Sequence, residues 1–124
     1  MNNCTLVLGT SLKSNRYSHM AVKKLREKKI EVKAFGLELG RIDDVQVDTE
    51  LLNYENIHTV TLYLNPKVQK SYYDYILSLE PKRVIFNPGT ENMELLRLLN
   101  ARGIQSEIAC TLVLLATGQY EAFE

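Results

Sequence analysis

The chain has 124 residues, of which 45% are hydrophobic and 24% are charged, a composition typical of a soluble globular protein. Its 15 basic and 15 acidic residues give a formal net charge of zero at pH 7, which argues against nucleic acid and against an anionic membrane as partners. Two cysteines are too few for a disulfide scaffold, and no close pairing of cysteine with histidine indicates a structural metal site.

The beginning of the chain lacks the pattern of a secretory signal, and no segment approaches the ~20 apolar residues of a membrane span. We therefore expect a cytoplasmic protein. The length suits one domain over residues 1–124, and a domain of this size buries roughly two-thirds of its unfolded surface. The sequence leaves open whether copies of the chain associate and which protein partner they meet.

Segments typical of strands and of helices alternate along the chain. The apolar run 4–8 predicts a first strand, and apolar residues at helical spacing predict a helix over 17–28. A second strand is expected over 31–35. The polar segment 36–55 carries turn residues, and we expect at most a short helix near 49–52 within it.

The alternation continues in the second half, where a β-branched run predicts a third strand over 57–64. Asn65 and Pro66 then open a helix, because asparagine is a good N-cap and proline suits the first helical position. The remaining predicted elements are a strand over 83–86, a helix over 91–101, a strand over 104–108 and a helix over 110–117. The apolar stripe of the helix after Pro66 comprises Val68, Tyr72, Tyr75, Ile76 and Leu79, with Tyr73 expected to point outward.

This order of elements predicts an α/β fold, a Rossmann-like three-layer sandwich with helices on both faces of a sheet. Right-handed crossovers then give a five-stranded parallel sheet, which we expect in the order 3-2-1-4-5. In such sheets the ligand lies beyond the carboxyl ends of the strands, where the strand order reverses. We therefore expect the site between the first strand and the fourth.

The loop between the first strand and the first helix is the most informative segment of the chain. Such a turn presents backbone N–H groups and the positive end of a helix, and Lys13 and Arg16 add two cations. A second loop over 87–91, rich in turn-forming residues, opens another helix towards the same cleft. Together they predict a site for a phosphate-rich ligand. The residues expected at this edge are Gly9, Thr10, Ser11, Lys13, Asn15, Arg16, Phe35, Gly36, Asn65, Pro66, Gln69, Asn87, Pro88, Gly89, Thr90, Glu91, Ala109 and Cys110.

A plainer interpretation of this loop stays open, in which Gly9 serves only the turn and the two cations are solvated. The full dinucleotide motif G-x-G-x-x-G is absent, because Ser11 and Ser14 occupy its second and third glycine positions. The second strand ends at Phe35, where an NAD site would place an acid for the ribose. Both departures argue against NAD.

Four motifs carry a resemblance to a known family. Over 9–17 the chain reads Gly-Thr-Ser-x-Lys-x-Asn-Arg-Tyr, and over 59–66 it reads Thr-Val-Thr-Leu-Tyr-Leu-Asn-Pro. Over 86–92 it reads Phe-Asn-Pro-Gly-Thr-Glu-Asn, and over 109–115 it reads Ala-Cys-Thr-Leu-Val-Leu-Leu. In this order the motifs resemble the small stand-alone CoA-binding proteins, whose fold is similar to the CoA-binding domain of the succinyl-CoA synthetase alpha subunit.

The resemblance implies coenzyme A as the ligand. The phosphates would be held by Gly9, Ser11, Lys13, Asn15 and Arg16, and the adenosine end would be framed by Phe35, Gly36, Leu64, Asn65, Pro66 and Gln69. Pro88 and Gly89 would approach the pantetheine arm. CoA carries about four negative charges, which agrees with donors and cations gathered on one loop.

Catalysis is not expected of this chain on its own. The synthetase uses a phosphorylated histidine, and neither His19 nor His58 lies in a matching motif. We expect His19 to be a partly exposed surface residue. Cys110 lies where a strand meets a helix, so an enzyme acting on CoA thiols through this thiol is an alternative to a small buried cysteine. An NAD(P)-binding domain and a protein-interaction module that has lost its site also stay open.

Overall fold

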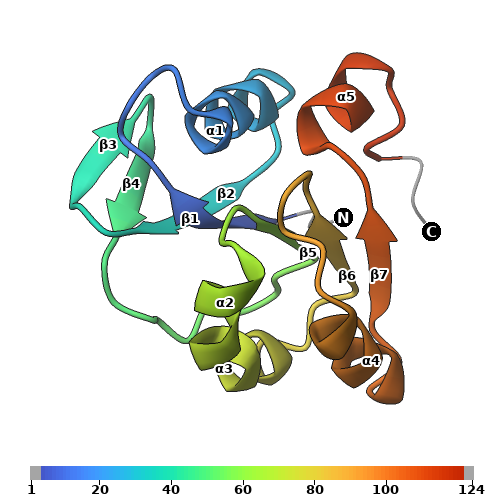
Figure 1. Ribbon diagram of the computed structural model, residues 1–124. Coiled ribbons are helices and arrows are strands. Elements are labelled where there is room, and N and C mark those ends of the chain that lie inside the picture. The colour runs from blue at the N-terminus through green and yellow to red at the C-terminus, as the bar shows by residue number, and fades with distance from the viewer. Residues whose placement is uncertain (1–3, 122–124) are drawn as a thin grey trace.

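The computed structural model describes residues 4–121, which form one sheet with helices on both faces (Figure 1). The strands are β1 Thr5–Thr10, β2 Val32–Gly36, β3 Gly40–Ile42, β4 Val45–Asp48, β5 Thr59–Leu62, β6 Arg83–Phe86 and β7 Gln105–Ile108. The helices are α1 Tyr17–Glu27, α2 Pro66–Gln69, α3 Tyr73–Ser78, α4 Met93–Ala101 and α5 Thr111–Ala116, with a 3₁₀ turn η1 Lys70–Tyr72 between α2 and α3.

The sheet differs from the prediction in both strand number and strand order. Within residues 4–121 it has seven strands, in the order β3-β4-β2-β1-β5-β6-β7, whereas five in the order 3-2-1-4-5 are expected from the sequence. Both additional strands come from the polar segment 36–55. β4 pairs parallel with β2 and takes its outer side, so β5, the predicted third strand, lies next to β1 instead. Residues 49–52 form no helix.

This arrangement moves the point where the strand order reverses. β1 pairs with β2 on one side and with β5 on the other, and all of these pairings are parallel. The described strands β4, β2, β1, β5, β6 and β7 all run in the same direction, and β3 alone is antiparallel to its neighbour β4. Counted along the chain, the parallel strands have the doubly wound order 3-2-1-4-5-6. The reversal therefore lies between β1 and β5.

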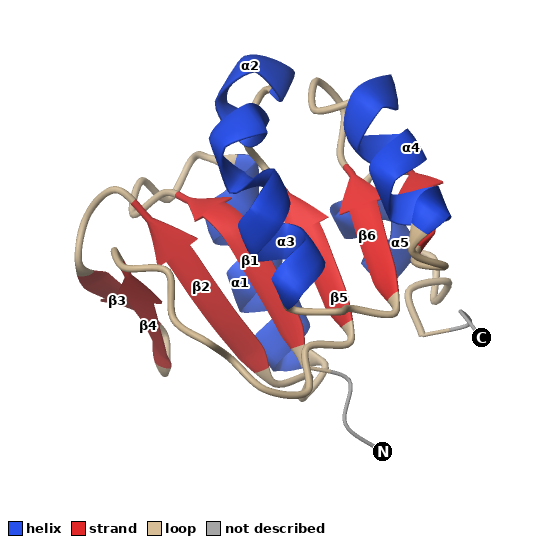
Figure 2. Ribbon diagram, turned by 90° about the horizontal axis from the view of Figure 1, so that it is seen from below, coloured by secondary structure: helices blue, strands red, loops and turns tan. Residues whose placement is uncertain are grey.

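Two apolar layers hold the sandwich together, one on each face of the sheet. α1 and α5 cover the face that carries Val7 and Ile85, while α2, α3 and α4 cover the face that carries Leu8 and Phe86 (Figures 1 and 2). All four of these side chains are fully buried. Burial of a large apolar side chain contributes roughly 1.5–3 kcal/mol, so the two layers supply the main stabilisation of the sheet.

The helix predicted after Pro66 is divided into two short helices and a 3₁₀ turn. Its start is confirmed, because the Asn65 side chain accepts a hydrogen bond from the backbone N–H of Val68 at 3.0 Å. The apolar stripe predicted for this helix is confirmed at Ile76, which is buried, but not at Val68, which is 43% exposed. Tyr73 does not point freely outward, because its hydroxyl donates to Glu94 at 3.0 Å.

At the amino ends of the parallel strands, a charged side chain lies in the protein interior. Arg83, at the start of β6, is 2% exposed. Its Nε donates to the hydroxyl of Thr59 at 3.1 Å, and one terminal nitrogen donates to the carbonyl oxygen of Tyr120 at 3.0 Å. The guanidinium also lies 4.4 Å from the centre of the Tyr120 ring, and 3.5 Å separates it from the Glu107 carboxylate. These contacts fix the segment after α5 against the sheet.

Candidate functional site

The connections that follow the parallel strands all emerge at one edge of the sheet, because the carboxyl ends of parallel strands lie together. The β1–α1 loop and the β2–β3 connection lie on the β2 side of this edge, and the β5–α2 loop lies beyond the reversal between β1 and β5. The β6–α4 loop and the β7–α5 junction lie on the β7 side. This is the edge at which the sequence predicts a ligand.

Gly9 has a backbone reason to be glycine. Its φ is +103°, and a Cβ at this position would lie 2.9 Å from Leu64 Cδ2 and 3.0 Å from the Tyr63 carbonyl oxygen. The β1–α1 loop therefore packs directly against the end of β5, and both the turn and this approach exclude a side chain. This geometry explains the glycine without a ligand.

Ser11 and two residues of the first turn of α1 give the β1–α1 loop its shape. The Ser11 N–H donates to the Ser18 hydroxyl at 3.0 Å, and the Ser11 hydroxyl accepts from the N–H of Lys13 at 3.1 Å. The His19 Nδ1 lies 3.1 Å from the Ser11 carbonyl oxygen, and the His19 side chain is buried. The expectation of a surface histidine is therefore wrong, because the ring is held inside the loop. Ser18 is a part of the site region that sequence reasoning missed, whereas the sequence places His19 near the predicted phosphates but not in the interior of the loop.

The N-terminus of α1 has the features of an anion site. Arg16 occupies the N-cap position without a side-chain hydrogen bond, and the first turn of α1 contains no acidic residue. The side chains of Lys13, Asn15 and Arg16 are exposed, and within residues 4–121 no carboxylate pairs with Lys13 or Arg16. An uncapped helix start leaves N–H donors unpaired, so a negative charge is stabilised there by the donors, the helix dipole and the two cations.

Gln69 and Asn87 lie within this edge but are buried beneath its surface. Gln69 Nε2 donates to the carbonyl oxygens of Leu64 at 2.7 Å and of Thr90 at 2.8 Å. Asn87 Nδ2 donates to Thr61 Oγ1 at 2.7 Å and to the carbonyl oxygen of Leu62 at 2.8 Å. Gln69 ties two neighbouring loops together and Asn87 ties the end of β6 to β5, and a direct contact of either with a ligand stays a prediction.

The remaining predicted residues divide between the exposed rim of this edge and the buried layer beneath it. Phe35 is buried and meets the Tyr72 ring edge-on at 5.7 Å between centroids. Leu64 is half-buried, whereas Asn65, Pro66, Pro88 and Gly89 are exposed. Gly89 has a φ of +91°, and its N–H donates to the Glu91 carboxylate at 3.0 Å. Thr10 is buried, with its hydroxyl bonded to the Val7 carbonyl oxygen at 2.8 Å.

A family of known proteins matches this chain over most of its length. The family model described as the CoA binding domain matches residues 3–116. The chain belongs to the CoA binding domain family. No curated protein matches the sequence.

Solved structures share the fold of this CoA binding domain. A crystal structure titled as an uncharacterized protein is 44% identical, covers 97% of this chain and 99% of its own, and has a TM-score of 0.93. A Thermus thermophilus protein, "cell-free ID.343", is 20% identical, covers 96% and 91%, and has a TM-score of 0.84. A hypothetical protein from Pyrococcus horikoshii is 21% identical, covers 86% and 75%, and has a TM-score of 0.76.

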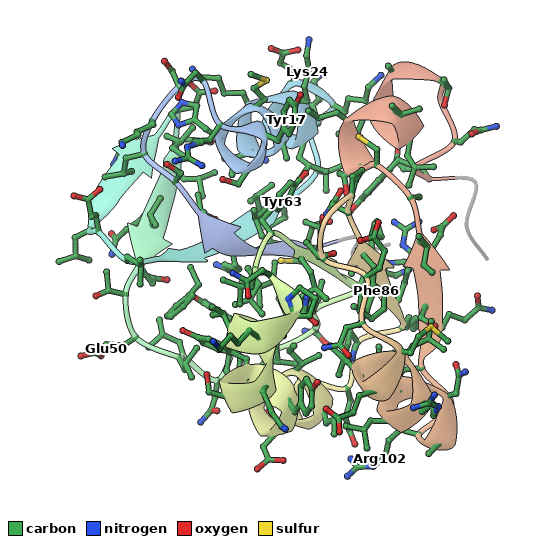
Figure 3. The ribbon with its side chains drawn as sticks, viewed as in Figure 1. Tyr17, Lys24, Glu50, Tyr63, Phe86 and Arg102 are labelled. Atoms are coloured by element: carbon green, nitrogen blue, oxygen red, sulfur yellow. The ribbon has the colours of Figure 1, made fainter. Side chains whose placement is uncertain are left out.

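A phenol and a thiol follow β5 and β7 at this edge of the CoA binding domain. Cys110 is half-buried at the N-cap of α5. Tyr63 lies on the side of the sheet that α1 and α5 cover (Figure 3), and among the described residues its buried hydroxyl has no partner at hydrogen-bonding geometry. Burial raises the pKa of Tyr63 to about 12, and the nearby hydroxyls of Thr111 and Thr61, which lie outside hydrogen-bonding geometry, partly offset this rise. Cys4, by contrast, is part of the core, and burial raises its pKa to about 11.

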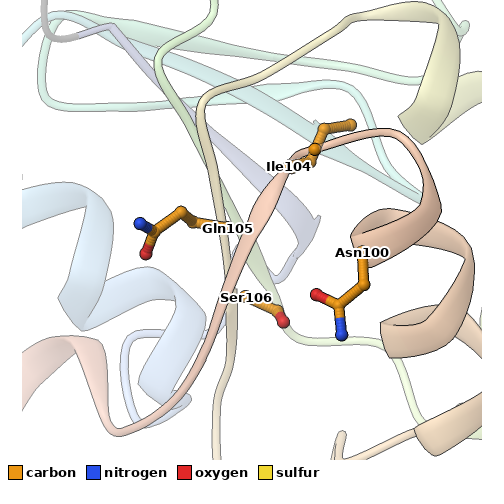
Figure 4. Close-up of a pocket in the computed structure, with 5 residues that line it drawn as sticks. Asn100, Ile104, Gln105 and Ser106 are labelled. Atoms are coloured by element: carbon orange, nitrogen blue, oxygen red, sulfur yellow. The ribbon is translucent and has the colours of Figure 1, made fainter.

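A shallow pocket of about 360 Å³ lies away from this edge (Figure 4). Asn100, Gly103, Ile104, Gln105 and Ser106 line it, so it sits at the junction of α4 with the start of β7 and carries no charged side chain. Among residues 4–121, no cluster of three or more histidine, cysteine, aspartate or glutamate side chains could hold a metal. Within the same residues, every helix is too short or too polar to cross a membrane.

Proposed function

We propose that this CoA binding domain binds coenzyme A, or an acyl-CoA, at the carboxyl edge of its parallel strands. The observation that carries the proposal is the start of α1, where Lys13 and Arg16 lie beside an uncapped helix N-terminus and pair with no carboxylate of residues 4–121. A pyrophosphate there would find backbone donors and two cations, and arginine can grip a phosphate with two parallel hydrogen bonds. The membership of the CoA binding domain family supports CoA over other phosphate-bearing ligands.

The position of the phosphates would set the direction of the rest of the molecule. With the pyrophosphate over β1, the adenosine would extend over Phe35 and Gly36 of β2, and Leu64, Asn65 and Pro66, which follow β5, would bound the site on the other side of β1. The pantetheine arm would then pass Pro88 and Gly89 on its way to Cys110. Both Pro88 and Gly89 are exposed, and nothing lies within 4 Å of a Cβ built on Gly89, which leaves room for a flexible arm.

Binding, as a carrier, a sensor or a partner-dependent module, is the function that the side chains at this edge support. The acid closest to the predicted pantetheine path, Glu91, accepts a hydrogen bond from the Gly89 N–H, so its carboxylate is occupied in shaping the loop. His19 is likewise held by the Ser11 carbonyl oxygen. A general acid or base must reach its substrate, and these two groups are engaged within the loops themselves.

Two measurements test the proposal. Native mass spectrometry of freshly purified protein would identify a CoA that co-purifies. Thermal unfolding with CoA, dephospho-CoA, acetyl-CoA and NAD then ranks the ligands, because a ligand at 100 times its dissociation constant stabilises by roughly 2.7 kcal/mol. We expect CoA to stabilise more than dephospho-CoA. A larger shift with NAD would favour a dinucleotide site, and no shift with any of the four would favour an interaction module.

Cys110 supports a second candidate, in which the thiol reacts with CoA disulfide. The Cys110 thiolate would attack one sulfur of the disulfide, forming a Cys110–CoA mixed disulfide and releasing one CoA thiolate. The half-buried position at the β7–α5 junction, beyond the predicted pantetheine path, favours this candidate. Intact-mass measurement after incubation with CoA disulfide tests it. An adduct that disappears in Cys110→Ser supports the reaction, and an unmodified mass contradicts it.

A further inference from the structure

β7 is the last strand at one edge of the sheet, and within residues 4–121 no strand pairs with its outer side (Figure 1). Its register with β6 determines which of its backbone groups are turned outward. The N–H groups of Gln105 and Ala109 donate to carbonyl oxygens on the β6 side. In a parallel ladder alternate residues bond to the same neighbour, so the N–H and C=O groups of Ser106 and Ile108 point away from β6.

The two edges of the sheet differ in how they are protected against pairing with another chain. Edge strands are commonly very short, or carry a lysine, a proline or a bulge. β3, at the other edge, has only three residues, and the exposed Arg41 lies at its centre. β7 has four residues without lysine or proline, its register with β6 is regular, and Ile108 is 57% exposed. The edge at β7 is therefore open to a further strand.

A second β7 in antiparallel direction fits the outward groups of the first. With a two-fold axis at Ser106, this residue faces Ser106 of the second copy, and their N–H and C=O groups bond to each other in both directions. Ile108 then faces Ile104 of the second copy, to whose carbonyl oxygen it donates. The formal net charge of the chain is zero, so two copies do not repel each other at pH 7.

The charge of Glu107 selects this register over the neighbouring one. Of the four residues of β7, Glu107 alone is charged, and its carboxylate lies 3.5 Å from the guanidinium of Arg83. An axis at Glu107 would place two carboxylates directly opposite each other, and like charges on facing residues destabilise a strand pair. With the axis at Ser106, Glu107 faces the neutral side chain of Gln105 instead.

The same register brings an exposed apolar side chain to the pocket beside β7. Ile104, Ser106 and Ile108 share the face of the sheet that α4 covers, because side chains alternate along a strand. Ile104 and Ser106 line the shallow pocket of about 360 Å³ together with Asn100 of α4 (Figure 4). Ile108 of each copy would enter the uncharged pocket of the other, which removes apolar surface from water. The edge is therefore complementary to itself, as a two-fold contact requires.

We propose that two copies of this chain associate through β7, antiparallel about a two-fold axis at Ser106, with Ile108 of each copy in the pocket of the other. The sheet then continues without interruption from one copy into the next. The inference is independent of the proposed function, because it rests on the backbone and side chains of the edge strand.

Sedimentation velocity over a wide range of protein concentration tests the association. We expect a dimer whose dissociation constant rises at least about a hundredfold in Ile108→Lys, because both copies lose an isoleucine contact and place an ammonium group in an uncharged pocket. Circular dichroism should show an unchanged fold, since Ile108 is exposed in the single chain. Leu39→Lys is the matched control, because Leu39 is 68% exposed beside the other edge strand, and it should remain dimeric.

Disulfide cross-linking tests the register. In a Cys110→Ser background, Ser106→Cys places two thiols across the axis, where the Cα atoms of a facing pair are about 5.5 Å apart, within the reach of a disulfide. We expect a disulfide-linked dimer on a non-reducing gel. Ile108→Cys introduces a more exposed thiol that faces Ile104 and not its own copy, so it should cross-link far less.

Each result supports or overturns the pairing. A monomer at every concentration overturns it, as does a dimer that persists in the folded Ile108→Lys variant. Loss of the dimer in Leu39→Lys alone would place the contact at the other edge and also overturn the inference. If Ile108→Lys does not fold, the cross-links decide: a dimer in Ser106→Cys alone supports the pairing, and equal or absent cross-linking in the two cysteine variants contradicts it.

Discussion

Gln69 donates a side-chain hydrogen bond to the carbonyl oxygen of Thr90 at 2.8 Å, which joins the loops that follow β5 and β6. The same amide nitrogen donates to Leu64, and the amide oxygen accepts from Asn92 at 2.9 Å. All of these groups meet at a side chain that is fully buried. The relative position of two loops at the ligand edge therefore depends on one amide.

We predict that Gln69→Leu lowers the free energy of unfolding by about 2–4 kcal/mol, because it removes the donor from the buried carbonyl oxygen of Thr90 and from the partly buried one of Leu64. The Asn92 amide would keep only its bond to the Tyr73 hydroxyl. Urea denaturation monitored by circular dichroism measures the change. Gln105→Leu replaces an exposed glutamine and should stay within about 0.5 kcal/mol of the unaltered protein. Equal stability of the two variants would contradict the bridging role of Gln69.

The cations of the β1–α1 loop give a prediction on binding. Arg16→Ala should weaken CoA binding by about 1.5–3 kcal/mol, because a charged hydrogen bond to phosphate is lost, and stability should hardly change since the side chain is exposed. Calorimetric titration gives the affinity. Arg102→Ala removes an exposed arginine that follows α4 and serves as the control. Unchanged affinity in Arg16→Ala would remove Arg16 from the site.

Gly36 offers a test of the close approach between β1 and β2. Gly36→Ala places a methyl group 2.1 Å from the Thr10 carbonyl oxygen, so the backbone must shift, and we expect a loss of about 2–4 kcal/mol. Gly103→Ala adds a methyl group in open space at a φ of +73°, and only the conformational cost of about 1–2 kcal/mol applies. Thermal unfolding of both variants compares the two costs. A smaller loss in Gly36→Ala than in Gly103→Ala would contradict the packing of this loop.

Tyr63→Phe should leave stability unchanged or raise it by up to about 1 kcal/mol, because the buried hydroxyl has no partner at bonding geometry. Tyr120→Phe is the matched comparison, since its buried hydroxyl bonds to that of Thr5, and it should lose about 1 kcal/mol. Denaturant titration at pH 7 measures both. A clear loss in Tyr63→Phe alone would show that its hydroxyl is bonded in the folded protein.

The ion pair between Arg26 and Asp44 predicts a dependence on pH. The guanidinium donates to both carboxylate oxygens, at 2.9 and 2.8 Å, and these bonds lower the pKa of Asp44. A lowered pKa in the folded state stabilises the fold above the ordinary value of 3.8, and this contribution is lost as the pH falls through the lowered value. The melting temperatures of the unaltered protein and Asp44→Asn should therefore converge below pH 3.8. A constant difference down to the lowest pH would contradict the pairing.

The positions of most elements follow from local sequence, and the strand order does not. The strand over 83–86 is confirmed at both ends, and Asn65 is the N-cap that its side chain predicts. β4 has only four residues, and its alternation of Val45 and Val47 with polar neighbours is the signal that could have revealed it. When β4 is not recognised, the outer edge of β2 lacks a partner, and β5 is assigned to it. In the structure β4 occupies that edge and β5 pairs with β1.

The candidate site shows the same division between local and tertiary information. The loops could be named from the sequence, because each follows an apolar strand and opens a helix. The burial of Gln69, Asn87 and His19 could not, because it depends on loops that meet only in the folded sheet. A polar residue at a predicted ligand edge can therefore either contact a ligand or be buried by its own hydrogen bonds, and the sequence does not distinguish the two.

The buried position of Arg83 determines how far a recombinant version of this chain must extend. The likeness to the CoA binding domain ends at residue 116, but Tyr120, four residues later, supplies a carbonyl oxygen and an aromatic face to the guanidinium. A recombinant version trimmed to the family boundary would lose the Tyr120 contacts of Arg83 and keep those to Thr59 and Glu107, at a cost of about 1.5–3 kcal/mol. A recombinant protein should therefore extend through at least Glu121, and an affinity tag should follow that residue.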